Sequence, residues 1–153
     1  LHSFPTRRSS DLIARFSDVD QFGHMNNSVY FSLYDLAKTT YIKDVLGSAD
    51  WSKLAIVVAN INANFFMPVF FSDHLVIETA VVHLGHKSFT LLQRAVTTDT
   101  HEVKCECRTV MVGYDLATKE PKLISEDYKE AICRYEEKTL EELSKGKIGR
   151  AHV

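Results

Sequence analysis

The chain has 153 residues and carries 18 lysines and arginines against 20 aspartates and glutamates, a formal net charge of −2. A chain of this length can form one domain with a substantial hydrophobic core. A slightly acidic chain without a basic stripe is not typical of nucleic-acid-binding proteins. No apolar run reaches the roughly 18 residues that a membrane-spanning helix requires. We therefore expect one compact domain that binds neither nucleic acid nor membranes.

The two ends of the chain look foreign to this domain. The segment LHSFPTRRSSDL at residues 1–12 and the segment IGRAHV at residues 148–153 both resemble translated sequencing-adapter text. Segments of such origin are set aside before the fold is considered. We expect the domain to run from 13 to 147, and we expect both ends to be unpacked because they were never selected against its core.

The first third of the chain predicts a short strand and one long helix. The strand is expected in IARFS at 13–17. From Asn27 to Leu46 apolar residues recur at helical spacing, and Gly47 suits the position just past a helix end. The apolar positions are Val29, Tyr30, Leu33, Leu36, Ala37, Tyr41 and Val45.

Four strand candidates and a second helix follow. The strands are expected over 55–66, 74–84, 87–98 and 102–112. In the last of these, charged residues alternate with apolar or small ones, which predicts one solvated and one buried face in an antiparallel sheet. The charged positions are Glu102, Lys104, Glu106 and Arg108, and the others are Val103, Cys105, Cys107, Thr109 and Met111. The segment SEDYKE begins a charged stretch that predicts a helix over 125–143.

The three cysteines are an odd number, and Cys105 and Cys107 share one strand face. They are interpreted as small core residues of a reducing compartment, so we expect a cytoplasmic protein. A Cys-x-Cys metal site is the alternative, but no other histidine or cysteine stands at ligand spacing, and we expect no metal. The histidines His74, His83 and His101 are expected in turns or on the surface.

One long helix and an antiparallel sheet can cover each other if the sheet wraps around the helix. The segment DVDQFGHMNNSVYFSLYDLA at 18–37 resembles the signature of hotdog-fold acyl thioesterases of the 4-hydroxybenzoyl-CoA thioesterase type, in which D-x-D-x-x-G precedes H-x-N-N-x-x-Y. The segment HKSF at 86–89 resembles a K-S-F element of the same family. The resemblance covers roughly 13–116 and implies an α+β hotdog fold, an antiparallel sheet wrapped around one long central helix.

The residues of the first motif suit thioester chemistry even without the family. The helix start near Asn27 offers free N–H groups that can polarise a carbonyl. Asp20 can fold back over that start because Gly23 permits a tight turn, and its carboxylate can act as general base or nucleophile. His24 can orient water or hold the thioester oxygen, and Asn26 can support the loop. The alternative is that the two asparagines only cap the helix.

The family resemblance assigns the catalytic role to Asp20. Asp20 and His24 also match the aspartate and histidine of plant acyl-carrier-protein thioesterases, but Phe22 stands where those enzymes have an asparagine. This departure favours a mechanism centred on Asp20. The hydroxybenzoyl enzymes lack the histidine, so an aromatic substrate is not implied. Tyr30 completes the motif and is expected to contact the substrate.

Four further residues complete the expected site. Lys87 and Ser88 resemble a place that meets the phosphates or pantetheine of CoA in the family, and the alternative for them is a solvated strand edge. Asp18 is expected to be a loop or cap carboxylate that supports the site. Asp35 is either a supporting acid near the site or an exposed helix residue.

The resemblance implies hydrolysis of an acyl-CoA or acyl-carrier-protein thioester without a cofactor. It also implies a homodimer or homotetramer, because exposed edge strands need partners and similar hotdog proteins join edge to edge. Two other functions remain open: a hotdog lyase that dehydrates or hydrates acyl thioesters, and a non-catalytic acyl-thioester binder. The retained Asp20 counts against the binder.

Overall fold

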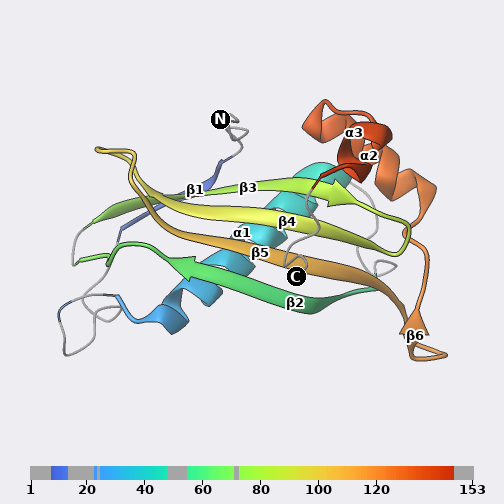
Figure 1. Cartoon of the computed structure of the whole chain (residues 1–153), viewed down its shortest axis with the longest axis horizontal. Coiled ribbons are helices and arrows are strands. Elements are labelled where there is room, and N and C mark those ends of the chain that lie inside the picture. Colours follow the sequence, from blue (N-terminus) through green and yellow to red (C-terminus); the bar gives the residue numbers. More distant parts are fainter. Residues whose placement is uncertain (1–7, 14–22, 24, 48–54, 71–72, 147–153) are drawn as a thin grey trace. The chain divides into compact units, whose positions relative to one another are not determined.

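The computed structural model describes residues 8–13, 23, 25–47, 55–70 and 73–146 (Figure 1). Along the chain these form β1 (Arg8–Ile13), α1 (Asn27–Leu46), β2 (Ile56–Phe65), β3 (His74–Leu84), β4 (Ser88–Thr97), β5 (Val103–Asp115), β6 (Glu120–Pro121), α2 (Glu126–Glu136) and α3 (Leu140–Ser144). The sheet has the order β1-β3-β4-β5-β2, and β6 pairs with β5. An antiparallel sheet with a long helix confirms the expected α+β class.

Hydrophobic periodicity located the long elements well. α1 has the predicted bounds, and Gly47 ends it with φ 62° while its N–H donates to the carbonyl of Lys43 at 2.9 Å. β3 also has the predicted bounds, and β2 and β4 differ from prediction by one residue at each end. β5 runs three residues further than expected, to Asp115.

The pairing of β1 contradicts the expectation that the N-terminal segment is unpacked. Residues Arg8–Ile13 pair antiparallel with β3, with Asp11 opposite Val76, although 1–12 was expected to be unpacked. Pairing with an edge strand uses backbone N–H and C=O groups that every residue except proline carries, so a foreign sequence can still fill it. The strand expected at 13–17 and the segment 148–153 lie, but for Ile13, outside the described residues.

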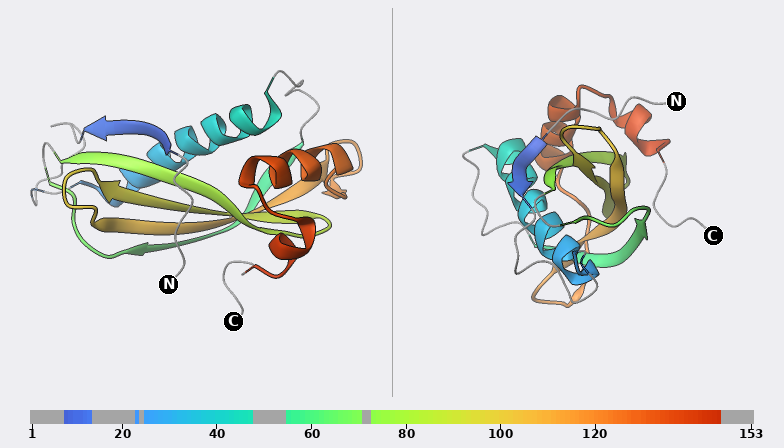
Figure 2. Two further views of the ribbon diagram at one scale, coloured as in Figure 1. Left: turned by 90° about the horizontal axis from the view of Figure 1, so that it is seen from above. Right: turned by 90° about the vertical axis from the view of Figure 1, so that its left-hand side faces the viewer.

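The C-terminal helix corrects another expectation, because the predicted single helix is two helices (Figure 2). α2 ends at Glu136, and the residue that caps its C-terminus, Glu137, has a left-handed φ of 56°. Thr139 then caps α3: its side chain accepts from the N–H of Glu142, and the Glu142 carboxylate accepts from the N–H of Thr139. This reciprocal capping box satisfies the N–H groups of a new helix start.

The chain divides into two compact units, which we describe separately. The first comprises residues 1–42, 63–79 and 93–107. One face of α1 packs there on the sheet in a core of Met25, Tyr30, Tyr34, Ala37, Val69, Leu75, Ile77, Ala95, Cys105 and Cys107. The amide of Gln93 crosses this core and donates to the Tyr34 carbonyl at 2.9 Å and to Thr79 Oγ1 at 3.2 Å.

The second unit comprises residues 43–62, 80–92 and 108–153. In its described part α2 packs on the sheet, with the rings of Phe89 and Tyr128 5.7 Å apart. Ile132 of α2 and Leu143 of α3 are fully buried. His83 is also buried, and its Nδ1 lies 3.0 Å from the Gly146 carbonyl oxygen. The expectation that His83 is a surface or turn residue is therefore wrong, because the chain after α3 covers it.

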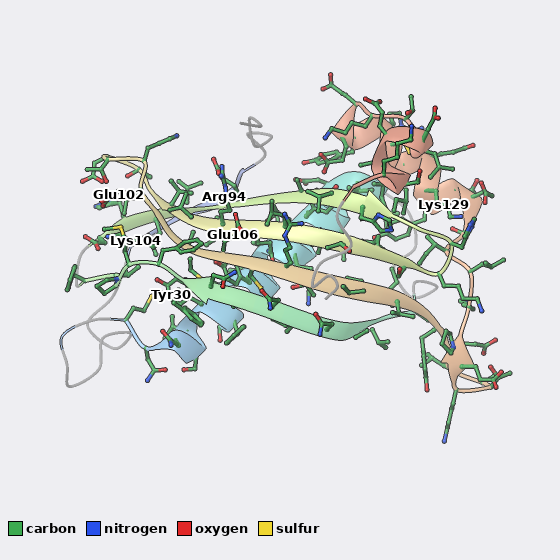
Figure 3. All side chains as sticks on the ribbon, viewed as in Figure 1. Tyr30, Arg94, Glu102, Lys104, Glu106 and Lys129 are labelled. Atoms are coloured by element: carbon green, nitrogen blue, oxygen red, sulfur yellow. The ribbon has the colours of Figure 1, made fainter. Side chains whose placement is uncertain are left out.

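The predicted alternation of β5 holds for its apolar face only. Cys105 and Cys107 are buried, but Lys104 on the supposedly solvated face is only 5% exposed. Glu78 of β3 is equally buried and forms an ion pair with Arg94 at 2.9 Å. Lys104 Nζ lies 3.5 Å from a carboxylate oxygen of Glu102 (both labelled in Figure 3). Ion pairing allows charged side chains to be covered, so a charge in an alternating pattern does not by itself predict a wet face.

Candidate active site

α1 begins with an open, capped N-terminus. Asn26 Oδ1 accepts hydrogen bonds from the N–H of Ser28 at 2.9 Å and from its hydroxyl at 2.8 Å. The N–H of Val29 bonds to the Asn26 carbonyl at 3.0 Å. Asn27 is exposed, and as the first residue of α1 it has an N–H that no carbonyl of the helix can accept. The first N–H groups of a helix have no partner within it and carry partial positive charge, so this one is available to a bound carbonyl.

The chain just before α1 is held in place from two sides. Met25 is 2% exposed, and its N–H donates to the carbonyl of Val69 at 2.6 Å. Gly23 has φ 90°, a conformation that glycine adopts without strain. The tight turn expected from Gly23 is consistent with this backbone.

Tyr30 lies in the first turn of α1 and is 2% exposed (Figure 3). Its ring lies 6.2 Å from that of Tyr34 and 5.5 Å from that of Phe65. Its buried hydroxyl has no hydrogen-bond partner in the described part of the chain. Burial raises the pKa of this phenol, and the nearby Cys105 and Asp73 raise it further. Tyr30 therefore stays protonated and can donate a hydrogen bond.

The structure brings together Asn26, Asn27 and Tyr30 at the start of α1. Asp18, Asp20 and His24 lie outside the described residues, so their roles remain predictions. Asp35 has an exposed side chain whose carboxylate is 2.8 Å from Lys38 Nζ, which gives it a surface partner.

Lys87 and Ser88 belong to the second unit. Lys87 is exposed, and its carbonyl accepts from the N–H of Gly113 at 2.9 Å. Ser88 is half-buried as the first residue of β4, and its carbonyl accepts from the N–H of Gly85 at 2.8 Å. The Lys87 side chain therefore has access to solvent at the start of a strand.

The groups at the start of α1 are backbone N–H, amide and phenol. Such groups bind and polarise a carbonyl oxygen and do not favour a metal. Within the described ranges, no three histidine, cysteine, aspartate or glutamate side chains gather closely enough to hold a metal ion. No helix in the same ranges is long and apolar enough to cross a membrane.

Comparison with known proteins identifies the family. The family model of the thioesterase-like superfamily matches residues 14–132. No curated protein matches the chain by sequence. The chain belongs to the thioesterase-like superfamily.

Solved structures agree with this assignment. A Thermus thermophilus thioesterase, crystallised with coenzyme A and zinc, is 26% identical, with a TM-score of 0.77 over 92% of this chain and 100% of that chain. YbaW, a probable thioesterase from Escherichia coli, is 25% identical, with a TM-score of 0.70 over 91% of this chain and 100% of that chain. A 1,4-dihydroxy-2-naphthoyl-CoA thioesterase from Synechocystis shares the fold at 13% identity, with a TM-score of 0.72 over 81% of this chain and 93% of that chain. The fold is thus the expected hotdog fold, and these findings support a thioester hydrolase as the class of enzyme.

Proposed function

We propose that this protein hydrolyses acyl-CoA thioesters to a free carboxylic acid and a thiol, with Asp20 as the general base or nucleophile. The observation that carries the proposal is the free N–H end of α1 at Asn27, exposed beside the Asn26 cap. A carbonyl oxygen bound there would be polarised by the helix dipole and by a hydrogen bond. His24 would orient the attacking water or hold the thioester oxygen, and Gly23 would shape the turn between them.

We propose CoA as the thiol, with acyl carrier protein as the alternative carrier. The Thermus thermophilus relative was crystallised with coenzyme A, which supports CoA here. Lys87 and Ser88 would contact the phosphates or pantetheine, because an exposed ammonium can bind a phosphate. Asp18 would support the loop, and Asp35 would support the helix, around these groups.

We further propose that two chains build each site, in a homodimer or a tetramer. β2 ends the sheet order, and its apolar residues Val57, Val58 and Ile61 are 39–47% exposed. In the first unit Phe66 and Phe70 are 57% and 50% exposed. An apolar edge strand invites pairing, and pairing with a second copy would cover it. Asp20 of one chain would then face Lys87 or Ser88 of the partner subunit.

An assay with several acyl-CoAs and a thiol reagent tests the activity. Release of free CoA supports hydrolysis. A change in acyl unsaturation without thiol release supports the lyase instead, and binding without either reaction supports a non-catalytic binder.

The variant Asp20→Asn tests the mechanism. Asparagine keeps the shape and turn preference of aspartate but removes its charge and basic lone pair. We expect normal folding, retained binding, and a loss of about 10² to 10⁴ in turnover. His24→Ala should lose less, since water can partly replace an orienting group. Asp44→Asn is the matched control, because Asp44 is exposed near the C-terminal end of α1. Wild-type turnover in folded Asp20→Asn would refute the mechanism.

A further inference from the structure

Two tyrosines on the same face of α1 have opposite hydrogen-bond environments. Tyr30 and Tyr34 are one helical turn apart, and both are buried in the core of the first unit. The Tyr34 hydroxyl donates to the carbonyl of Cys105 at 3.1 Å. The Tyr30 hydroxyl has no partner in the part of the chain that the structure describes. Tyr34 therefore has a structural role that Tyr30 lacks.

A buried hydroxyl without an acceptor costs stability, so it requires an explanation. Phenylalanine would make the same ring contacts with Tyr34 and Phe65 without that cost. A ligand that supplies an acceptor explains why the hydroxyl is there.

The position of Tyr30 indicates which ligand atom it meets. Side chains of an α-helix lean toward the N-terminus, so the Tyr30 side chain lies over the turn that begins at Asn27. That turn begins with the N–H of Asn27, which has no acceptor within the helix. A phenol donor and a backbone donor thus belong to the same helix end, and burial keeps the phenol protonated.

We propose that the Tyr30 hydroxyl donates a hydrogen bond to the carbonyl oxygen of the bound acyl thioester, together with the N–H of Asn27. This inference rests on the proposed thioesterase activity. When water adds its oxygen electron pair to the carbonyl carbon, one of its protons passes to the Asp20 carboxylate and the carbonyl π pair moves onto the carbonyl oxygen. The two donors stabilise that negative charge. When the C=O bond re-forms, the C–S bond breaks and the thiolate leaves to be protonated. If the Asp20 oxygen adds instead, a mixed anhydride forms, and water then hydrolyses it to the free acid and the Asp20 carboxylate.

Kinetics of Tyr30→Phe and the matched control Tyr34→Phe test the role. We expect Tyr30→Phe to keep or raise the thermal midpoint, to lower kcat by about 10²-fold, and to leave KM nearly unchanged. We expect Tyr34→Phe to lower the thermal midpoint and to keep kcat near the wild-type value. A merely structural Tyr30 would show the reverse, with lower stability and intact kcat.

Binding of two stable analogues tests the contact without any reaction. The first is a ketone in which methylene replaces the thioester sulfur, and the second is an S-alkyl thioether that lacks the carbonyl oxygen. Wild-type protein should bind the ketone more tightly, and Tyr30→Phe should reduce that preference several-fold while leaving thioether binding unchanged.

The outcomes separate this inference from the proposed function. Wild-type protein that hydrolyses thioesters while Tyr30→Phe keeps both kcat and the ketone preference would overturn the inference alone. A ketone preference that depends on Tyr30, in a protein that hydrolyses no thioester, would overturn the proposed function and support the contact. Protein that neither binds nor hydrolyses would overturn both.

Discussion

The carboxylate of Glu136, in the last turn of α2, accepts a hydrogen bond from the backbone N–H of Val81 on β3 at 3.0 Å. Both residues are buried. Among the described residues, the pairing of β3 with β1 reaches as far as Glu78, and further along β3 the Glu136 carboxylate supplies the acceptor for the N–H of Val81. An open strand edge is a site of unwanted pairing, and α2 closes this part of it.

Replacing Glu136 should therefore destabilise the protein. Glu136→Ala leaves the buried N–H of Val81 without an acceptor, and we expect the free energy of unfolding to fall by about 1–3 kcal/mol. Glu136→Gln keeps a carbonyl oxygen at this place and should lose less. Urea denaturation of both variants measures the difference. Equal stability of Glu136→Ala and the wild type would contradict this role.

The chain after α3 approaches β3 too closely for any residue but glycine. A Cβ built on Gly146 would lie 1.7 Å from the carbonyl oxygen of Val82. Gly146→Ala should therefore displace this segment from β3 and lower the thermal midpoint. Gly85→Ala is the control, because its nearest neighbours would be 3.5 Å away, an ordinary contact. Equal midpoints for the two variants would be inconsistent with the close approach.

Because β1 pairs with β3, we expect deletion of the N-terminal segment to destabilise the protein. Deleting residues 1–12 removes the strand that pairs with β3 from His74 to Glu78 and exposes a strand edge. We expect a lower free energy of unfolding and more aggregation on heating. Deleting residues 148–153 should change neither, as the adapter resemblance predicts. Light scattering during thermal unfolding compares the two truncated proteins. If deletion of residues 1–12 changes neither stability nor aggregation, then β1 adds no stability.

The proposed dimer predicts a selective effect of charge on the exposed aromatic residues. Phe66→Asp, at a side chain 57% exposed in the first unit, should shift the assembly toward monomer. Leu116→Asp is the control, because Leu116 is 72% exposed in the turn after β5. Sedimentation velocity at micromolar concentration reports the assembly. A fully active wild-type monomer under these conditions would rule out a site shared between two chains.

Because the Cys105 thiol is buried, we predict that the protein loses stability in alkaline solution. Burial raises the pKa of its thiol from 9.0 to about 11. Below pH 9 both folded and unfolded states keep the proton, so the stability is intact. Between pH 9 and about 11 the unfolded state loses its proton first, so unfolding becomes easier as pH rises. Cys105→Ala should show a flatter fall of unfolding free energy over this range, and an identical slope would contradict the assignment.

Periodicity in the sequence was enough to predict most of the fold. The helical spacing of apolar residues from Val29 to Val45 indicated the extent of α1, because one face of this helix is buried. Gly47 indicated where the helix ends. The β-branched runs indicated the extent of β2 and β3. The break at Glu137 was missed because a left-handed residue there carries no glycine signal, although Thr139 and Glu142 form a recognisable capping box.

The candidate site was predicted in part. The Asn26 cap and the helix start at Asn27 followed from residue type and position. The hydroxyl of Tyr30 without a partner could not be foreseen, because its environment depends on Phe65 and Cys105, which are distant in sequence. Lys104 and His83 were expected near solvent for the same reason: their cover comes from other segments of the chain.

The amide of Gln93 has a consequence for the alignment of α1. Apolar surfaces alone would let a helix slide along its sheet, because dispersion contacts have little directional preference. The Gln93 amide donates hydrogen bonds to the Tyr34 carbonyl and to Thr79 Oγ1. The Tyr34 hydroxyl donates a hydrogen bond to the Cys105 carbonyl. A shift of the helix by one turn would break the two hydrogen bonds that involve Tyr34, because the bond from Gln93 to Thr79 joins two strands of the sheet. The bond from Gln93 to the Tyr34 carbonyl, which Tyr34→Phe would keep, sets the axial position of α1 and with it the position of Asn27 at the start of the helix.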